Sequence, residues 1–141
     1  MIRFVIPGEP QPWRRGRLGK GKGGKPMHFK DDRTRANQAH WSAAALDALN
    51  GAPPIEGPVE AEIVARFMPP KSTSRVKLAA MLAGEIVPTK RPDADNICKN
   101  LDGLNGVAFR DDAQVARLLV TKIYAESAGV DVMICAFRKA A

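Results

Sequence analysis

The chain has 141 residues, 45% hydrophobic and 26% charged, which is typical of one folded domain and excludes a disordered or fibrous chain. Its formal charge is +7 at neutral pH, and phosphates are the obvious partner for such a surplus. Cys98 and Cys135 form no CxxC pair, which argues against a disulfide framework or a structural zinc site. No segment resembles a membrane span or a signal peptide, so the sequence predicts a cytoplasmic protein with no membrane partner.

The first half of the chain alternates between strand and helix patterns. Residues 1–7 are expected to form a strand that Pro7-Gly8 ends, and residues 10–30 a mobile basic loop. A helix is predicted from Asp31 or Asp32, whose side chains suit a cap, to Leu49. Residues 59–67 then alternate apolar and polar side chains with a period of two, which is typical of a half-exposed strand.

The surplus positive charge lies in the segment from Pro10 to Lys30. This segment holds seven of the 22 Lys and Arg and no acid. Trp13 adds an aromatic ring that can stack on a base, which favours nucleic acid over a merely solvated loop. We therefore assign DNA binding to six basic residues: Arg14, Arg15, Arg17, Lys20, Lys22 and Lys25.

The second half contains a predicted helix over residues 72–84, capped by Ser72 or Ser74 and closed by Gly84, and a second one that begins at Asp93 or Asp95. A short strand is expected at residues 107–109. Residues 115–125 and 130–137 are interpreted as two strands of a hairpin. The prediction is a single α+β domain over residues 1–141, with a mixed sheet of about four strands and two to three helices.

Residues 91–112 contain five aspartates and one central lysine. At helical spacing, Asp95, Lys99 and Asp102 fall on one face, while Ile97, Leu101 and Leu104 fall on another that would join the core. Carboxylates without His or Cys form hard oxygen sites, which favour Mg²⁺ or Mn²⁺ over zinc. Each aspartate taken alone is more often a helix cap or a turn residue, but caps do not explain the shared polar face.

The chemistry that most depends on such a site is phosphodiester hydrolysis, with metal-activated water and a lysine charge near the phosphate. Two other interpretations stay open. A binding protein would keep the basic loop without cutting DNA. A sugar transferase would use Asp93-Ala94-Asp95 as its metal motif, although 141 residues leave little room for a nucleotide-binding domain.

The motifs PDADN (92–96), Lys99, DGLNG (102–106) and DDAQV (111–115), with an echo in IPGEPQPWRRGR, resemble the RusA family of Holliday junction resolvases, often carried by prophages. The resemblance implies a RusA-like fold and a Mg²⁺-dependent homodimeric endonuclease of DNA recombination and repair that makes paired nicks across four-way DNA junctions.

When the family's functional residues are matched to this sequence, the resemblance implies that the catalytic, metal-binding carboxylates are Asp93, Asp95 and Asp112. It implies that Lys99 is the essential base or charge stabiliser. Asp111 is a lesser candidate. Only Asn100 and Leu101 separate Lys99 from Asp102, one residue fewer than the family pattern, so the role of Asp102 stays open.

Overall fold

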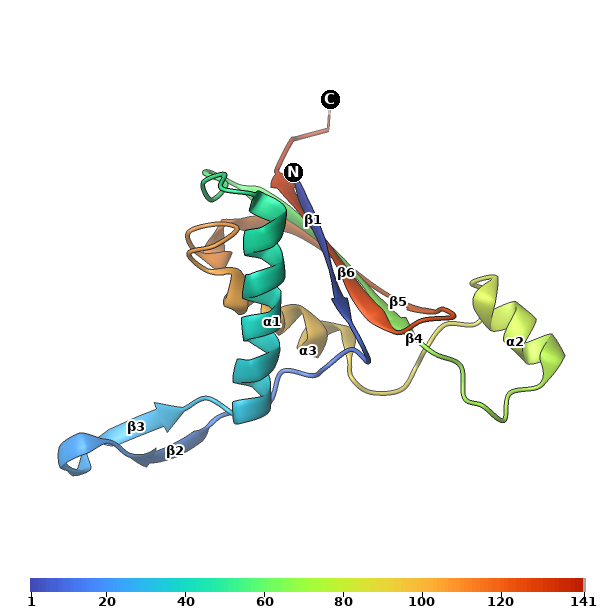
Figure 1. The fold of residues 1–141 in the computed structure, drawn as a ribbon, viewed down its shortest axis with the longest axis horizontal. Helices are drawn as coiled ribbons and strands as arrows, with labels where there is room; N and C mark the ends of the chain where they lie inside the picture. Colours follow the sequence, from blue (N-terminus) through green and yellow to red (C-terminus); the bar gives the residue numbers. More distant parts are fainter. Residues whose placement is uncertain (141) are drawn as a thin grey trace.

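The computed structural model describes residues 1–140, and its centre is a four-stranded mixed sheet (Figure 1). The sheet order is β1-β6-β4-β5, and a separate two-stranded sheet pairs β2 with β3. The strands are β1 (Ile2–Pro7), β2 (Arg17–Lys20), β3 (Pro26–Phe29), β4 (Val59–Phe67), β5 (Val115–Tyr124) and β6 (Gly129–Ala136). The predicted α+β fold with a mixed four-stranded sheet is confirmed.

The described part of the chain also contains three α-helices and three 3-10 turns. The α-helices are α1 (Asp32–Leu49), α2 (Arg75–Leu82) and α3 (Ala94–Cys98), and the 3-10 turns are η1 (Lys22–Gly24), η2 (Lys99–Leu104) and η3 (Asp112–Gln114). Asp31 caps α1 by accepting from the backbone N–H groups of Arg33 and Thr34, and Ser74 caps α2. Both caps are among those that the sequence predicts. None of these helices is long and apolar enough to cross a membrane.

The core lies between one face of the sheet and the layer formed by α1, α3 and η2 (Figure 1). Alternate residues of β1, β4 and β6 point into it, which is the burial expected of a sheet covered on one side. Trp41 of α1 is 1% exposed and meets Phe4 edge to face, with ring centroids 6.3 Å apart. Ile97, Leu101 and Leu104 are buried, as their spacing predicts.

The last two strands do not form the predicted hairpin. β4 lies between them, antiparallel to β6 and parallel to β5. The backbone N–H of Ala125 donates to Phe67 O at 2.9 Å, so the chain follows β4 to its end before it turns into β6. The expected strand at residues 107–109 is instead a turn with an isolated bridge at Phe109.

The predicted basic loop differs too, because residues 17–29 form a β-hairpin that projects from the base of α1 (Figure 1). Gly16 permits the close approach of the two arms at the base of the hairpin, since a Cβ there would clash with the backbone carbonyl oxygen of Phe29. η1 turns the chain through Gly23 and Gly24, both with a φ of 74°, which favours glycine. The segment has no alternating apolar pattern, which is why the sequence predicts a loop.

Candidate active site and nucleic-acid interface

Asp93 and Asp95 lie at the start of α3, directly after the cis peptide between Arg91 and Pro92. The carbonyl oxygen of Asp93 accepts from the backbone N–H groups of Asn96 and Ile97, at 3.1 and 3.0 Å. The buried side chain of Ile97 anchors the helix on the core, while both carboxylates are exposed. Neither carboxylate makes a side-chain hydrogen bond or an ion pair within residues 1–140.

The predicted single helix changes its winding at Lys99, where α3 passes into η2. Lys99 Nζ lies 5.3 Å from the ring centroid of Trp13, a cation–π contact. The ring of Trp13 therefore lies against Lys99, and its stacking on a DNA base stays a prediction. Within the described residues, three buried side-chain atoms have no hydrogen-bond partner: Trp13 Nε1, Asn96 Oδ1 and Asn100 Oδ1.

Asp102 is held by α1 rather than left on a shared polar face with Asp95. Its Oδ1 accepts from Gln38 Nε2, and its Oδ2 lies 3.6 Å from Lys30 Nζ. Burial raises the pKa of the Asp102 carboxyl, Lys30 opposes that shift, and the charge of Asp112 adds to it. Sequence reasoning missed Lys30 and Gln38. The signal was the core-facing stripe of α1, which continues from Trp41 back to the polar residues Gln38 and Thr34.

The two aspartates before β5 differ in what their side chains do. Asp111 caps η3: its Oδ1 accepts from Ala113 N at 2.8 Å, and Gln114 Oε1 accepts from Asp111 N at 3.0 Å. Gln114 Nε2 donates to the carbonyls of Ile55 and Gly57, at 3.1 and 2.7 Å, which fixes the turn. Asp112 is exposed and makes no side-chain hydrogen bond or ion pair within the described residues.

The donor chemistry of Asp93, Asp95 and Asp112 fits a hard divalent cation, because all three are exposed carboxylates free of other bonds. They are not assembled into a ligand set: within residues 1–140, no group of three or more His, Cys, Asp and Glu side chains is placed to hold a metal ion. η2 contacts η3, and the charge of Asp112 in η3 acts on the carboxyl of Asp102 in η2. The metal-binding and catalytic roles of Asp93, Asp95, Asp112 and Lys99 stay predictions.

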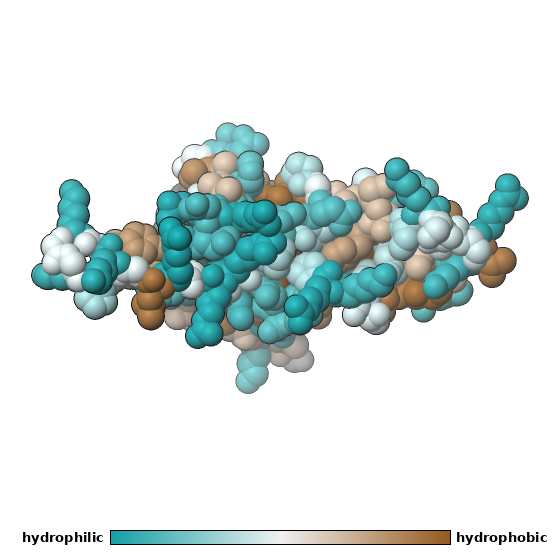
Figure 2. Space-filling view, turned by 90° about the horizontal axis from the view of Figure 1, so that it is seen from below, coloured by the Kyte–Doolittle hydropathy of each residue, from teal (hydrophilic) through white to brown (hydrophobic). Residues whose placement is uncertain are grey.

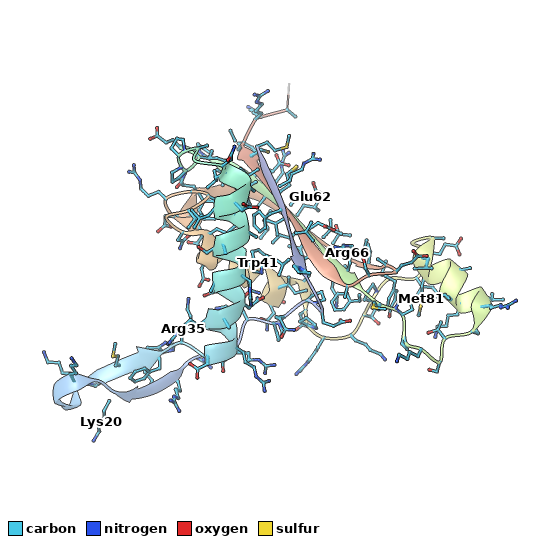
Figure 3. The ribbon with its side chains drawn as sticks, in the orientation of Figure 1. Lys20, Arg35, Trp41, Glu62, Arg66 and Met81 are labelled. Carbon is cyan, nitrogen blue, oxygen red and sulfur yellow. The ribbon has the colours of Figure 1, made fainter. Side chains whose placement is uncertain are left out.

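The six predicted DNA-binding residues lie before and along the β2–β3 hairpin. All six are exposed: Arg14, Arg15, Arg17, Lys20, Lys22 and Lys25. Figure 3 shows Lys20 far out on the hairpin and Arg35 near the start of α1. A hollow of about 500 Å³ is lined by four arginines, Arg15, Arg17, Arg33 and Arg35, together with Phe29, Lys30, Asp31 and Asp32. The sequence prediction omitted Arg33 and Arg35. Hydrophilic residues gather over this end of the molecule (Figure 2).

An exposed basic surface is the electrostatic signature of a nucleic-acid-binding protein. Free carboxylates in the same small α+β domain are the ligands that a metal-dependent phosphodiester hydrolase needs. The family model described as endodeoxyribonuclease RusA matches residues 7–135. The chain therefore belongs to the RusA endodeoxyribonuclease family. It is also 35% identical over 138 residues to the uncharacterized protein YqaN of Bacillus subtilis (strain 168), with 94% of each chain covered.

Proposed function

We propose that this protein is a Mg²⁺-dependent endodeoxyribonuclease that resolves four-way DNA junctions by paired nicks during recombination and repair. The observation that carries the proposal is the division among the five aspartates of residues 91–112. Asp102 and Asp111 are engaged by other groups of the protein, whereas Asp93, Asp95 and Asp112 are exposed and free. Family membership supports the same assignment.

Each part of the site has a role in this proposal. Asp93, Asp95 and Asp112 would hold Mg²⁺, whose chemistry in such hydrolysis is to activate a water and to neutralise charge on the phosphate. Lys99 would place a fixed positive charge beside the scissile phosphate, held in position by the ring of Trp13. The basic residues of the hairpin would bind the phosphates of the junction arms.

The test mixes purified protein with a synthetic four-way junction or with a linear duplex of matched sequence, with Mg²⁺ or with EDTA. We expect cleavage of the junction alone, and only with metal. The Asp95→Asn variant should bind the junction and leave it uncut, because the basic hairpin is unchanged. Cleavage of the linear duplex at the same rate as the junction would show that the protein is a nonspecific nuclease. Binding without any cleavage would favour a non-catalytic branched-DNA-binding protein.

Two nicks related by a two-fold axis suit a symmetric pair of subunits, so the proposal includes a homodimer. Light scattering at the protein concentration of the cleavage assay should give twice the mass of one chain. A single-chain mass under those conditions would contradict the paired-nick mechanism.

A further inference from the structure

Both ends of the β2–β3 hairpin are held by one buried polar stripe of α1. Before β2, Arg14 N donates to Thr34 Oγ1 at 2.8 Å. After β3, Lys30 Nζ donates to Gln38 Oε1 at 2.6 Å. Thr34 and Gln38 are one helical turn apart and are 0% and 5% exposed. The hairpin itself contributes no buried residue, and the side-chain hydrogen bonds that join it to the domain in the described chain lie at its base.

The Gln38 side chain continues from the hairpin base towards the acidic segment. Its Nε2 donates to Asp102 Oδ1, and Lys30 Nζ lies 3.6 Å from Asp102 Oδ2. Gly103 allows η2 to come this close, since a Cβ there would lie 2.8 Å from Gln38 Cβ and 3.1 Å from its Cα. We call Lys30, Gln38 and Asp102 the hairpin anchor. Because η2 contacts η3, the anchor ends beside the turn that carries Asp112.

The contribution of the hairpin anchor to protein stability does not explain why its side chains are polar. Apolar side chains of similar volume often stabilise a protein as well as a buried or half-buried ionic network does. A network of directional bonds does something that apolar contacts do not, which is to fix one relative position of the groups that it joins. Here it joins the basic hairpin to the acidic segment, through residues that are 64 and 72 positions apart in the chain.

We propose that the hairpin anchor holds the DNA-binding hairpin in a fixed position relative to the acidic segment and so determines which phosphodiester is cut. Lys30, Gln38 and Asp102 are then positioning residues, neither ligands nor reacting groups. The inference rests on the proposed nuclease function. If the anchor is broken, the protein should still bind DNA. The DNA strand should then lie in several alternative positions relative to the acidic segment.

The experiment compares wild-type protein with the Lys30→Met and Gln38→Met variants on an end-labelled four-way junction under single-turnover conditions, with products resolved to one nucleotide. Both variants should cut at several neighbouring phosphodiesters, with the main cut slowed about ten- to a hundredfold. Lys25→Met is the matched control, because it also removes one cation. It should weaken binding, measured in EDTA, and leave the cut position unchanged.

Hydrogen exchange gives a readout that is independent of cleavage. In both anchor variants the amides of residues 15–30 should exchange faster than in wild type, while those of β4 and β6 keep their protection. Lys30 is half exposed, so Lys30→Met tests the proposal without loss of a buried residue. A single unchanged cut site together with unchanged hairpin exchange would overturn the anchor. A wild-type protein that cuts no junction would overturn the proposed function, and the exchange comparison would still decide the anchor.

Discussion

At the scale of single residues, the hydrogen bonds of each aspartate side chain distinguish two kinds of carboxylate. One kind is already bonded to the protein, and the other is free to bind a cation. A carboxylate that already caps a turn or accepts from an amide has less capacity to ligate a cation. Asp111 is of the first kind and Asp112 of the second, although they are adjacent in sequence. The sequence leaves a role for Asp111 open, and its capping contact favours a structural role in the turn over metal binding.

This assignment predicts opposite effects for neighbouring substitutions. Asp112→Asn should lower junction cleavage about a hundredfold or more and leave the melting temperature unchanged, because the side chain binds nothing else in the described chain. Asp111→Asn should retain most activity, since asparagine is also a good cap. Asp111→Ala should lose about 1 kcal/mol of unfolding free energy. Single-turnover cleavage and urea unfolding measure the two properties. Equal inactivation by both asparagine variants would contradict the division of roles.

At the scale of elements, the approach of η2 to α1 determines the environment of Asp102. The carboxyl is half-buried beside Gln38, and the absence of a side chain at Gly103 permits that contact. Burial raises the pKa of Asp102 above its ordinary 3.8, despite the opposing charge of Lys30. The folded state therefore binds this proton more tightly than the unfolded state does, so ionisation of Asp102 costs stability at neutral pH.

The sign of this shift predicts how Asp102→Asn behaves. Asparagine resembles the protonated carboxyl, so the variant should be at least as stable as wild type at pH 7. As the pH falls through the folded-state pKa of Asp102, wild type becomes protonated and the difference should narrow. Urea unfolding of both proteins in EDTA, from pH 7 into the acidic range, measures this difference in free energy. A difference that widens at low pH would show that the pKa is lowered rather than raised.

Local patterns predicted the elements well and their partners poorly. The bounds of β4 and α1 follow from strand alternation and from the Asp31 cap, which are properties of neighbouring residues. The insertion of β4 between β5 and β6 depends on pairing between distant segments, which no local pattern records. Likewise, the aspartates near α3 were identifiable from their motif, whereas the contact between Asp102 and Gln38 crosses 64 positions.

At the scale of the whole molecule, the hairpin and the domain body have separate energetic roles. The buried core consists of the sheet face, α1 and the segment from Ile97 to Phe109, and the hairpin adds nothing to it. Four of the six predicted DNA-binding residues lie between Arg17 and Lys25 on the hairpin. Figure 1 shows that this arm extends well beyond the body, where a DNA strand can reach it.

Replacement of residues 17–29 by a short Gly-Ser linker should therefore weaken DNA binding strongly and leave the fold intact. Each phosphate contact contributes about 0.9 to the slope of log binding constant against log salt concentration, so loss of four cations should reduce that slope by about three to four. The midpoint of urea unfolding should change little, because no hydrophobic core residue is lost. Anisotropy titrations of a labelled junction in EDTA at several salt concentrations measure the slope. An unchanged slope would show that DNA binds the body of the domain rather than the hairpin. Arg33 and Arg35 would then be the first residues to substitute.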